Sequence, residues 1–66
     1  MSNFIVLTSQ YGNKVVINSN NIIFIDDDEE NEKVIGSRLT LLNRNTVWVR
    51  ERPCEILDKI KENENG

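Results

Sequence analysis

The sequence lacks histidine and alanine altogether, and its 66 residues include one cysteine and one proline. With no histidine, and with Cys54 as its one thiol, the chain can build neither a cysteine–histidine zinc site nor a disulfide. Serine and cysteine nucleophile systems also lack their usual base. We therefore expect no metal, no cofactor and no enzymatic activity. Cys54 is expected to pack as a small apolar side chain.

Long apolar runs are missing as well. The longest two cover residues 4–7 and 22–25, and each is far shorter than the roughly 20 residues of a membrane-spanning helix. The first residues show neither the basic segment nor the apolar segment of a signal peptide. These features predict a cytoplasmic chain with a reduced thiol and no membrane contact.

The length and charge limit the size of the fold and its partners. We expect a single small domain over residues 1–62 and a frayed tail over residues 63–66. A chain this short buries only about 60% of its unfolded surface, so its stability is marginal. The net charge of −3 weakens long-range attraction to polyanions, which argues against duplex DNA as a partner.

The remaining composition favours strands. Isoleucine, valine and threonine together supply 17 residues, and these β-branched side chains fit pleated sheets better than helices. Gly12 suits a turn with positive φ, and Gly36 suits a bulge within a strand. The sequence predicts a five-stranded antiparallel sheet or small barrel, with strands at about 3–9, 14–18, 22–26, 33–42 and 46–51.

One helix is expected after the last strand. Pro53 fits a first helical turn, and Ile56, Leu57 and Ile60 follow it at the spacing of one apolar stripe. This pattern predicts a short C-terminal helix over about residues 53–62.

Residues 4–7 and 22–25 do not alternate between apolar and polar side chains. In a half-solvated sheet each run would place two large apolar side chains in water. One short helix covers only part of one face, so we expect further copies of the chain to supply the rest, as a homo-oligomer. A tightly curled monomeric barrel is the alternative.

Residues 26–32 carry six carboxylates. An EF-hand beginning at Asp26 would need glycine where Asn31 stands and glutamate where Ser37 stands, so the calcium motif is absent. We expect a solvated loop whose charge protects the neighbouring apolar run from aggregation.

All four arginines lie in the second half of the chain, around the single tryptophan. On a strand, Trp48, Arg50 and Arg52 alternate onto one face, where an aromatic ring and guanidinium groups could hold a compact anion such as a nucleotide. In the alternative, the arginines pair with the acidic segment and Trp48 covers apolar surface. The candidate ligand-binding residues are Trp48, Arg50, Arg52, Arg38, Arg44 and Tyr11.

The order of elements follows a pattern over residues 4–60. The residues that carry this pattern are Leu7, Thr8, Gly12, Val16, Ile17, Asn18, Ile22, Ile25, Leu39, Leu41, Val47, Val49, Glu51, Ile56 and Ile60. In these positions the chain resembles the small FlbD/SwrD-like proteins associated with flagellar motility. The valine-rich strand leading into a short helix also resembles the CsrA-type RNA-binding dimers, as a second possibility.

Three functions follow as hypotheses, and none is enzymatic. The first is a homo-oligomeric binding module that acts through protein–protein interaction. The second is capture of a small anionic ligand, such as a nucleotide, at a subunit interface. The third is RNA binding in the manner of the CsrA-type proteins.

Overall fold

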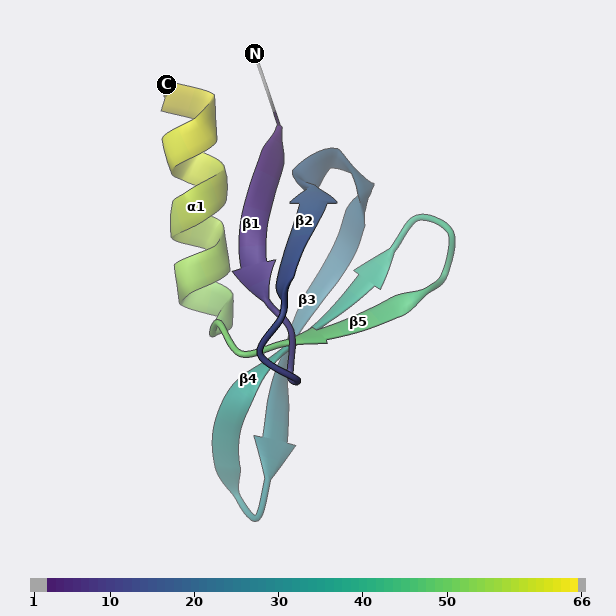
Figure 1. The fold of residues 1–66 in the computed structure, drawn as a ribbon, viewed down its shortest axis with the longest axis vertical. Helices are drawn as coiled ribbons and strands as arrows, with labels where there is room; N and C mark the ends of the chain where they lie inside the picture. Colours follow the sequence, from purple (N-terminus) through teal and green to yellow (C-terminus); the bar gives the residue numbers. More distant parts are fainter. Residues whose placement is uncertain (1–2, 66) are drawn as a thin grey trace.

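The computed structural model describes residues 3–65 of the chain. It is mainly β with one C-terminal helix, as the composition predicts (Figure 1). The strands are β1 (Phe4–Thr8), β2 (Lys14–Asn18), β3 (Ile22–Glu30), β4 (Lys33–Leu41) and β5 (Thr46–Val49), with a 3-10 turn, η1 (Ser19–Asn21), before β3 and the helix α1 (Pro53–Asn65) at the end.

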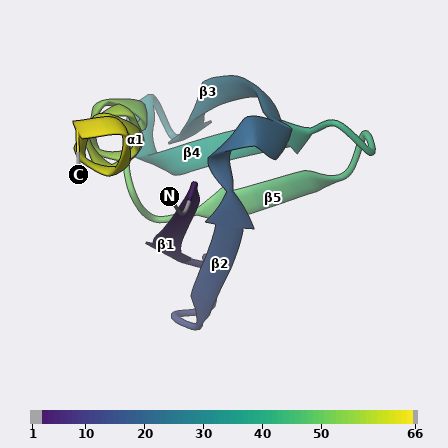
Figure 2. The ribbon, with the colours of Figure 1, turned by 90° about the horizontal axis from the view of Figure 1, so that it is seen from above.

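The strands form two sheets, so the prediction of one five-stranded sheet or barrel is wrong. β1 pairs with β2 in one sheet, and β3, β4 and β5 form the other in that order. Figure 2 shows the β1–β2 hairpin running across the three-stranded sheet. In the described part of the chain, the backbones of the two sheets are linked by an isolated bridge between Ser9 and Val49.

Two backbone hydrogen bonds, one on each side of the bridge, reinforce it. The Gln10 amide donates to the Trp48 carbonyl at 3.2 Å, and the Arg50 amide donates to the Thr8 carbonyl at 2.8 Å. The end of the first hairpin is thereby tied to the end of β5. Gly12, in the loop of that hairpin, has the predicted positive φ of 93°.

Residues 26–30 belong to β3, so the prediction of an acidic loop is wrong. The strand continues to Glu30, and a turn of two residues, Asn31 and Glu32, returns the chain into β4. Both turn residues have positive φ, 53° and 66°, as in the tight turns that suit twisted hairpins. Four of the five carboxylates in the strand are exposed and Asp28 is half-buried, so extending β3 costs them little burial.

Two cross-strand pairs also place opposite charges together in this hairpin. Asp26 lies across from Arg38, and Glu30 lies across from Lys33. Opposite charges at facing positions favour the extended pairing. The hairpin projects from the body of the molecule (Figure 1) and accounts for its long dimension of 39 Å, against 23 and 20 Å.

β4 approaches β5 closely at a glycine, next to a buried serine. The register shifts between Asp28 and Glu29, next to Gly36, where a bulge is predicted. A Cβ built on Gly36 would lie 2.0 Å from the Val49 carbonyl oxygen, so no larger residue fits this backbone. Ser37 beside it is fully buried, and its Oγ donates to the Glu51 carbonyl at 2.6 Å.

The core joins both sheets to the helix. α1 lies beside β1 (Figure 1), and Ile56 on its inner face is fully buried. It contributes to a core of six apolar residues, which are Ile5, Leu7, Ile17, Leu39, Val49 and Ile56.

The helix differs from the prediction in two respects. It continues to Asn65, so most of the segment expected to be a tail is helical, and residue 66 lies outside the described residues. Cys54 is exposed, so its predicted packing is wrong, because the first helical turn presents that side of the helix to solvent.

Candidate functional site

Trp48 lies on the solvent-facing side of the three-stranded sheet. It is paired directly with Arg38 on β4, which is paired in turn with Asp26 on β3, so the three side chains form one cross-strand row. Phe24, two residues before Asp26, shares this side and is 60% exposed, against 41% for Trp48. We call Phe24, Asp26, Arg38 and Trp48 the tryptophan face.

Arg38 has a carboxylate partner within this face. Its Nη2 lies 3.5 Å from Oδ2 of Asp26, and both side chains are about half exposed, at 53% and 50%. This is the pairing of an arginine with the acidic segment that the sequence offers as an alternative to ligand binding. A solvated pair of this kind contributes little to stability, so either residue can exchange its partner at low cost.

The other candidate residues are spread over the molecule. Arg44 occupies the turn between β4 and β5 with a positive φ of 69°. Arg52 lies just before the helix, and its carbonyl accepts from the Ile56 amide at 3.1 Å. Neither shares the row of Trp48 and Arg38.

Arg50 reaches toward the first hairpin instead. Its Nη2 donates to the Gln10 carbonyl at 3.2 Å, and the guanidinium lies beside Gly12. Tyr11, in the same loop, is 81% exposed. The structure thus places Arg50 beside the loop that contains Tyr11, whereas Arg38 lies next to Trp48 on the neighbouring strand.

Glu51 holds the end of β1 in place. Its two carboxylate oxygens accept from the Thr8 amide at 2.8 and 3.0 Å. Burial raises the pKa of this carboxyl, but the Thr8 amide, the Glu51 amide, the Thr8 side chain and the positive charge of Lys59 together outweigh burial and lower the pKa below its ordinary value. Glu51 is therefore a structural carboxylate that favours its charged form.

The outer side of the β1–β2 hairpin carries a second exposed apolar surface. Val6 lies directly across from Val16, and Phe4 is two residues from Val6 on the same side. These side chains are 55% (Phe4), 47% (Val6) and 61% (Val16) exposed. We call them the hairpin face. Ile5 and Leu7, which alternate with them, are buried in the core.

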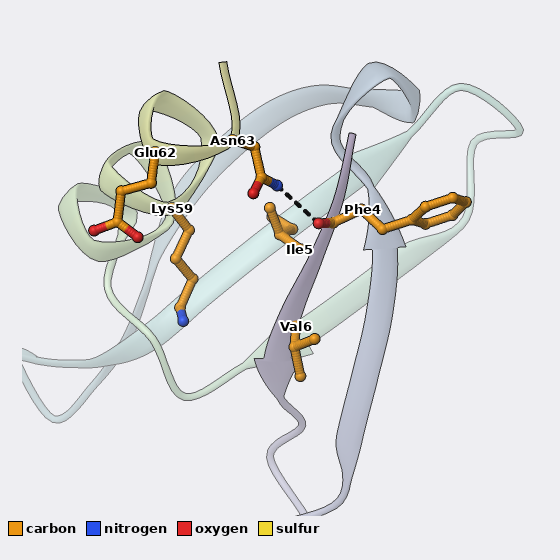
Figure 3. Close-up of a pocket in the computed structure, with 6 residues that line it drawn as sticks. All are labelled: Phe4, Ile5, Val6, Lys59, Glu62 and Asn63. Carbon is orange, nitrogen blue, oxygen red and sulfur yellow. Dashed lines mark hydrogen bonds between the residues drawn. The ribbon is translucent and has the colours of Figure 1, made fainter. Parts of the chain in front are cut away.

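A small pocket of about 230 Å³ lies between β1 and α1. In Figure 3, Asn63 of the helix points toward β1, where its Nδ2 donates to the Phe4 carbonyl at 2.7 Å. Glu62 points away from the strand, and the Phe4 ring is directed away from the helix (Figure 3). The volume is below the roughly 300–1,000 Å³ of typical small-molecule sites, and none of the predicted site residues lines it.

Residues 3–65 contain neither a cluster of potential metal ligands nor a helix that could span a membrane. Their side chains form no group of three or more potential metal ligands. The single helix of this part of the chain is neither long nor apolar enough to cross a bilayer.

Sequence reasoning missed Phe24, Glu51 and Asn63 as contributors to these surfaces. Phe24 belongs to an apolar run, and its exposure depends on which way the strand is turned. Glu51 and Asn63 contact residues 43 and 59 positions away, and no local pattern reports contacts at that separation. The hairpin face did leave a signal, namely the missing alternation of residues 4–7.

Comparisons of the chain with protein-family models, with curated proteins and with solved structures find no match.

Proposed function

We propose that this chain is a non-catalytic, homo-oligomeric binding module that acts through protein–protein interaction. The observation that carries the proposal is the hairpin face, where Phe4, Val6 and Val16 are adjacent and about half exposed or more. Covering apolar surface is favourable by about 25 cal/mol per Å². Contiguous exposed apolar surface of this kind is typical of interaction sites.

A second copy of the chain fits this surface. The outer side of the hairpin carries no carboxylate, and Lys14 is its only charged side chain. Two such faces related by a two-fold axis would pack valine against valine at the centre, with the lysines at the rim in water. Identical faces are self-complementary under this symmetry, and sheets pack face to face at about 10 Å.

The tryptophan face supports binding of a further protein partner. Exposed tryptophan, phenylalanine and arginine are the side chains that are enriched at protein interfaces.

Ligand capture by Trp48 and the arginines has less support, because Arg44 and Arg52 lie away from Trp48 and Arg38 already pairs with Asp26. RNA binding has less support still, because the acidic β3–β4 hairpin opposes it. A cytoplasmic location accords with the single exposed thiol of Cys54.

Light scattering on the purified protein tests self-association. We expect a mass of at least twice the monomer's 7.7 kDa at tens of micromolar. Val16→Lys introduces charge at an exposed position of the hairpin face and should reduce the mass to the monomer's. Ile35→Lys places the same charge on β4, where Ile35 is comparably exposed, and should change nothing. A wild-type monomer would contradict the oligomeric part of the proposal.

A further inference from the structure

We propose that the open edge of β3 binds an extended, lysine- or arginine-rich segment of a partner protein as an added strand. The site is the acidic arm, which we define as residues 26–36 at the projecting end of the β3–β4 hairpin, together with Phe24 and Ile25 at its base. The proposal shares with the proposed function only the claim that the chain binds proteins. It uses a different surface from self-association.

β3 has one unpaired edge. Within the described part of the chain it pairs with β4 alone. The Leu41 amide donates to the Asn45 carbonyl, which shows that odd-numbered residues of β4 turn their backbone groups toward β5. The even-numbered residues therefore bond to Asp26 and Asp28. It follows that the amides and carbonyls of Ile25 and Asp27 point outward, where an added strand can pair with them.

The side chains along this edge set the chemistry of the partner. Phe24, Asp26 and Asp28 lie on one side of the strand, and Ile25 and Asp27 lie on the other. The arm contains six carboxylates and one lysine. Among the residues that the structure describes, Asp26 is its only carboxylate with an ion-pair partner. A partner strand with basic residues facing Asp26 and Asp28, and an apolar residue on the side of Ile25, would match this edge.

The same charges exclude a second copy from this site. Pairing β3 with β3 of another copy would bring aspartates and glutamates into facing positions, which is destabilising. The hairpin face, by contrast, has no carboxylate. Self-association and binding at the β3 edge therefore use separate surfaces with opposite charge requirements.

The arm is already in the conformation that an added strand needs. Its two strands pair from Asp26 to Lys33, and at its base Gly36 lies close against the backbone of β5. A preformed edge spares the partner the cost of ordering the receptor, so only the incoming segment has to become extended.

The test uses the blocked, fluorescently labelled peptide Lys-Thr-Lys-Val-Lys-Thr-Lys and fluorescence anisotropy at low salt. We expect micromolar binding that weakens as salt is added. Two control peptides should bind at least tenfold more weakly: one with glutamate in place of each lysine, and one with proline in place of both threonines, which keeps the charge but removes backbone donors. Equal binding of the proline peptide would show general charge attraction and overturn the proposal.

Protein variants locate the site. The double variant Asp26→Asn, Asp28→Asn should weaken peptide binding at least tenfold, whereas Glu55→Gln, Asp58→Asn removes the same charge from the helix and should leave binding unchanged. Equal weakening by both pairs would overturn the assignment to β3. Amide hydrogen exchange should slow at Ile25 and Asp27 when the peptide is bound, and protection at Val16 instead would also overturn it.

The test of self-association and the test of binding at the β3 edge have independent outcomes. Val16→Lys is designed to abolish self-association, and it should keep full peptide binding. A peptide that binds neither protein would overturn the β3-edge proposal and leave the light-scattering result standing. In that case the carboxylates of the arm serve only to keep an open edge in solution.

Discussion

At the scale of single residues, Glu51 connects three parts of the molecule that are distant in sequence. Its carboxylate accepts from the Thr8 amide at the end of β1, and its own carbonyl accepts from the buried Ser37 hydroxyl of β4. Lys59 of α1 contributes a favourable positive charge. One residue between β5 and the helix thus joins both sheets and the helix through polar contacts.

We expect Glu51→Gln to lower the free energy of unfolding at neutral pH by about 1 kcal/mol, because hydrogen bonds to a charged acceptor are stronger than those to a neutral one. The pKa of Glu51 is lowered in the folded state, so the stability that it contributes is complete above the reference pKa of 4.5 and is lost as the pH falls through the lower, folded value.

Urea denaturation of both proteins between neutral pH and about pH 3 checks this, at one fixed protein concentration. The difference between wild type and Glu51→Gln should shrink over the acidic part of that range. Glu29→Gln, at an exposed position of β3, should stay within about 0.5 kcal/mol of wild type. A constant difference at all pH values would refute the role assigned to the Glu51 charge.

At the scale of elements, the β3–β4 hairpin carries a conformational cost at its tip. Glu32 has a φ of 66°, which is unfavourable for a residue with a Cβ. Glycine is the preferred second residue of such a turn after asparagine. We expect Glu32→Gly to stabilise the protein by about 0.5–1 kcal/mol, measured by urea denaturation.

Glu30→Gly is the matched control for this substitution. It removes the same side chain from the last residue of β3, where the backbone is extended and glycine is unfavourable, so it should destabilise the protein. Stabilisation by both substitutions would indicate that loss of negative charge, and not relief of the turn, is responsible.

The strands were predictable where their sequence contains runs of apolar, β-branched residues. They were not predictable where the strand consists of charged residues. The positions of β1 and β2 and the start of the helix follow from β-branched runs, Gly12 and Pro53. The far half of β3 has none of these features, since its residues are all acidic, and its pairing depends on Arg38 and Lys33 of the next strand. Gly36 approaches atoms of residues that lie 13 and 14 positions further along the chain, and the two sheets are linked by a bridge between Ser9 and Val49, so local sequence reports neither contact.

The candidate site was predictable only in part. The alternation around Val47, Trp48 and Val49 correctly places the tryptophan outside and Val49 inside. The arginines could not be grouped from the sequence, because Arg44 belongs to a turn and Arg50 reaches to the carbonyl of Gln10 on a different hairpin. Their separation is a result of chain geometry, which spacing along the sequence does not encode.

At the scale of the whole molecule, two sheets and one helix share a core of six residues. Stability at this size is only about 3–10 kcal/mol, from roughly 0.05–0.15 kcal/mol per residue. We expect Ile56→Ala, at a fully buried position, to cost about 3 kcal/mol. Because Ile56 packs with both sheets, far-UV circular dichroism and tryptophan fluorescence should report the same midpoint in thermal unfolding.

Leu57→Ala is the neighbouring control in the same helix. Leu57 is 49% exposed, so its truncation should cost well under 1 kcal/mol. Separate midpoints for the two probes in Ile56→Ala would show that the helix detaches while the sheets remain folded, and that the core is not one cooperative unit.

The close approach of β4 to β5 at Gly36 also defines a sequence signature. Position 36 admits no side chain, because a Cβ would meet the Val49 carbonyl oxygen, and position 37 needs a small hydroxyl side chain to satisfy the Glu51 carbonyl. Another chain with this close approach should therefore keep glycine followed by serine or threonine in its fourth strand. It should also keep a glutamate 14 residues after that hydroxyl, because the Glu51 carboxylate accepts from the Thr8 amide, while its surface residues differ freely. Relatives too divergent to be recognised by overall identity could be identified by these three positions.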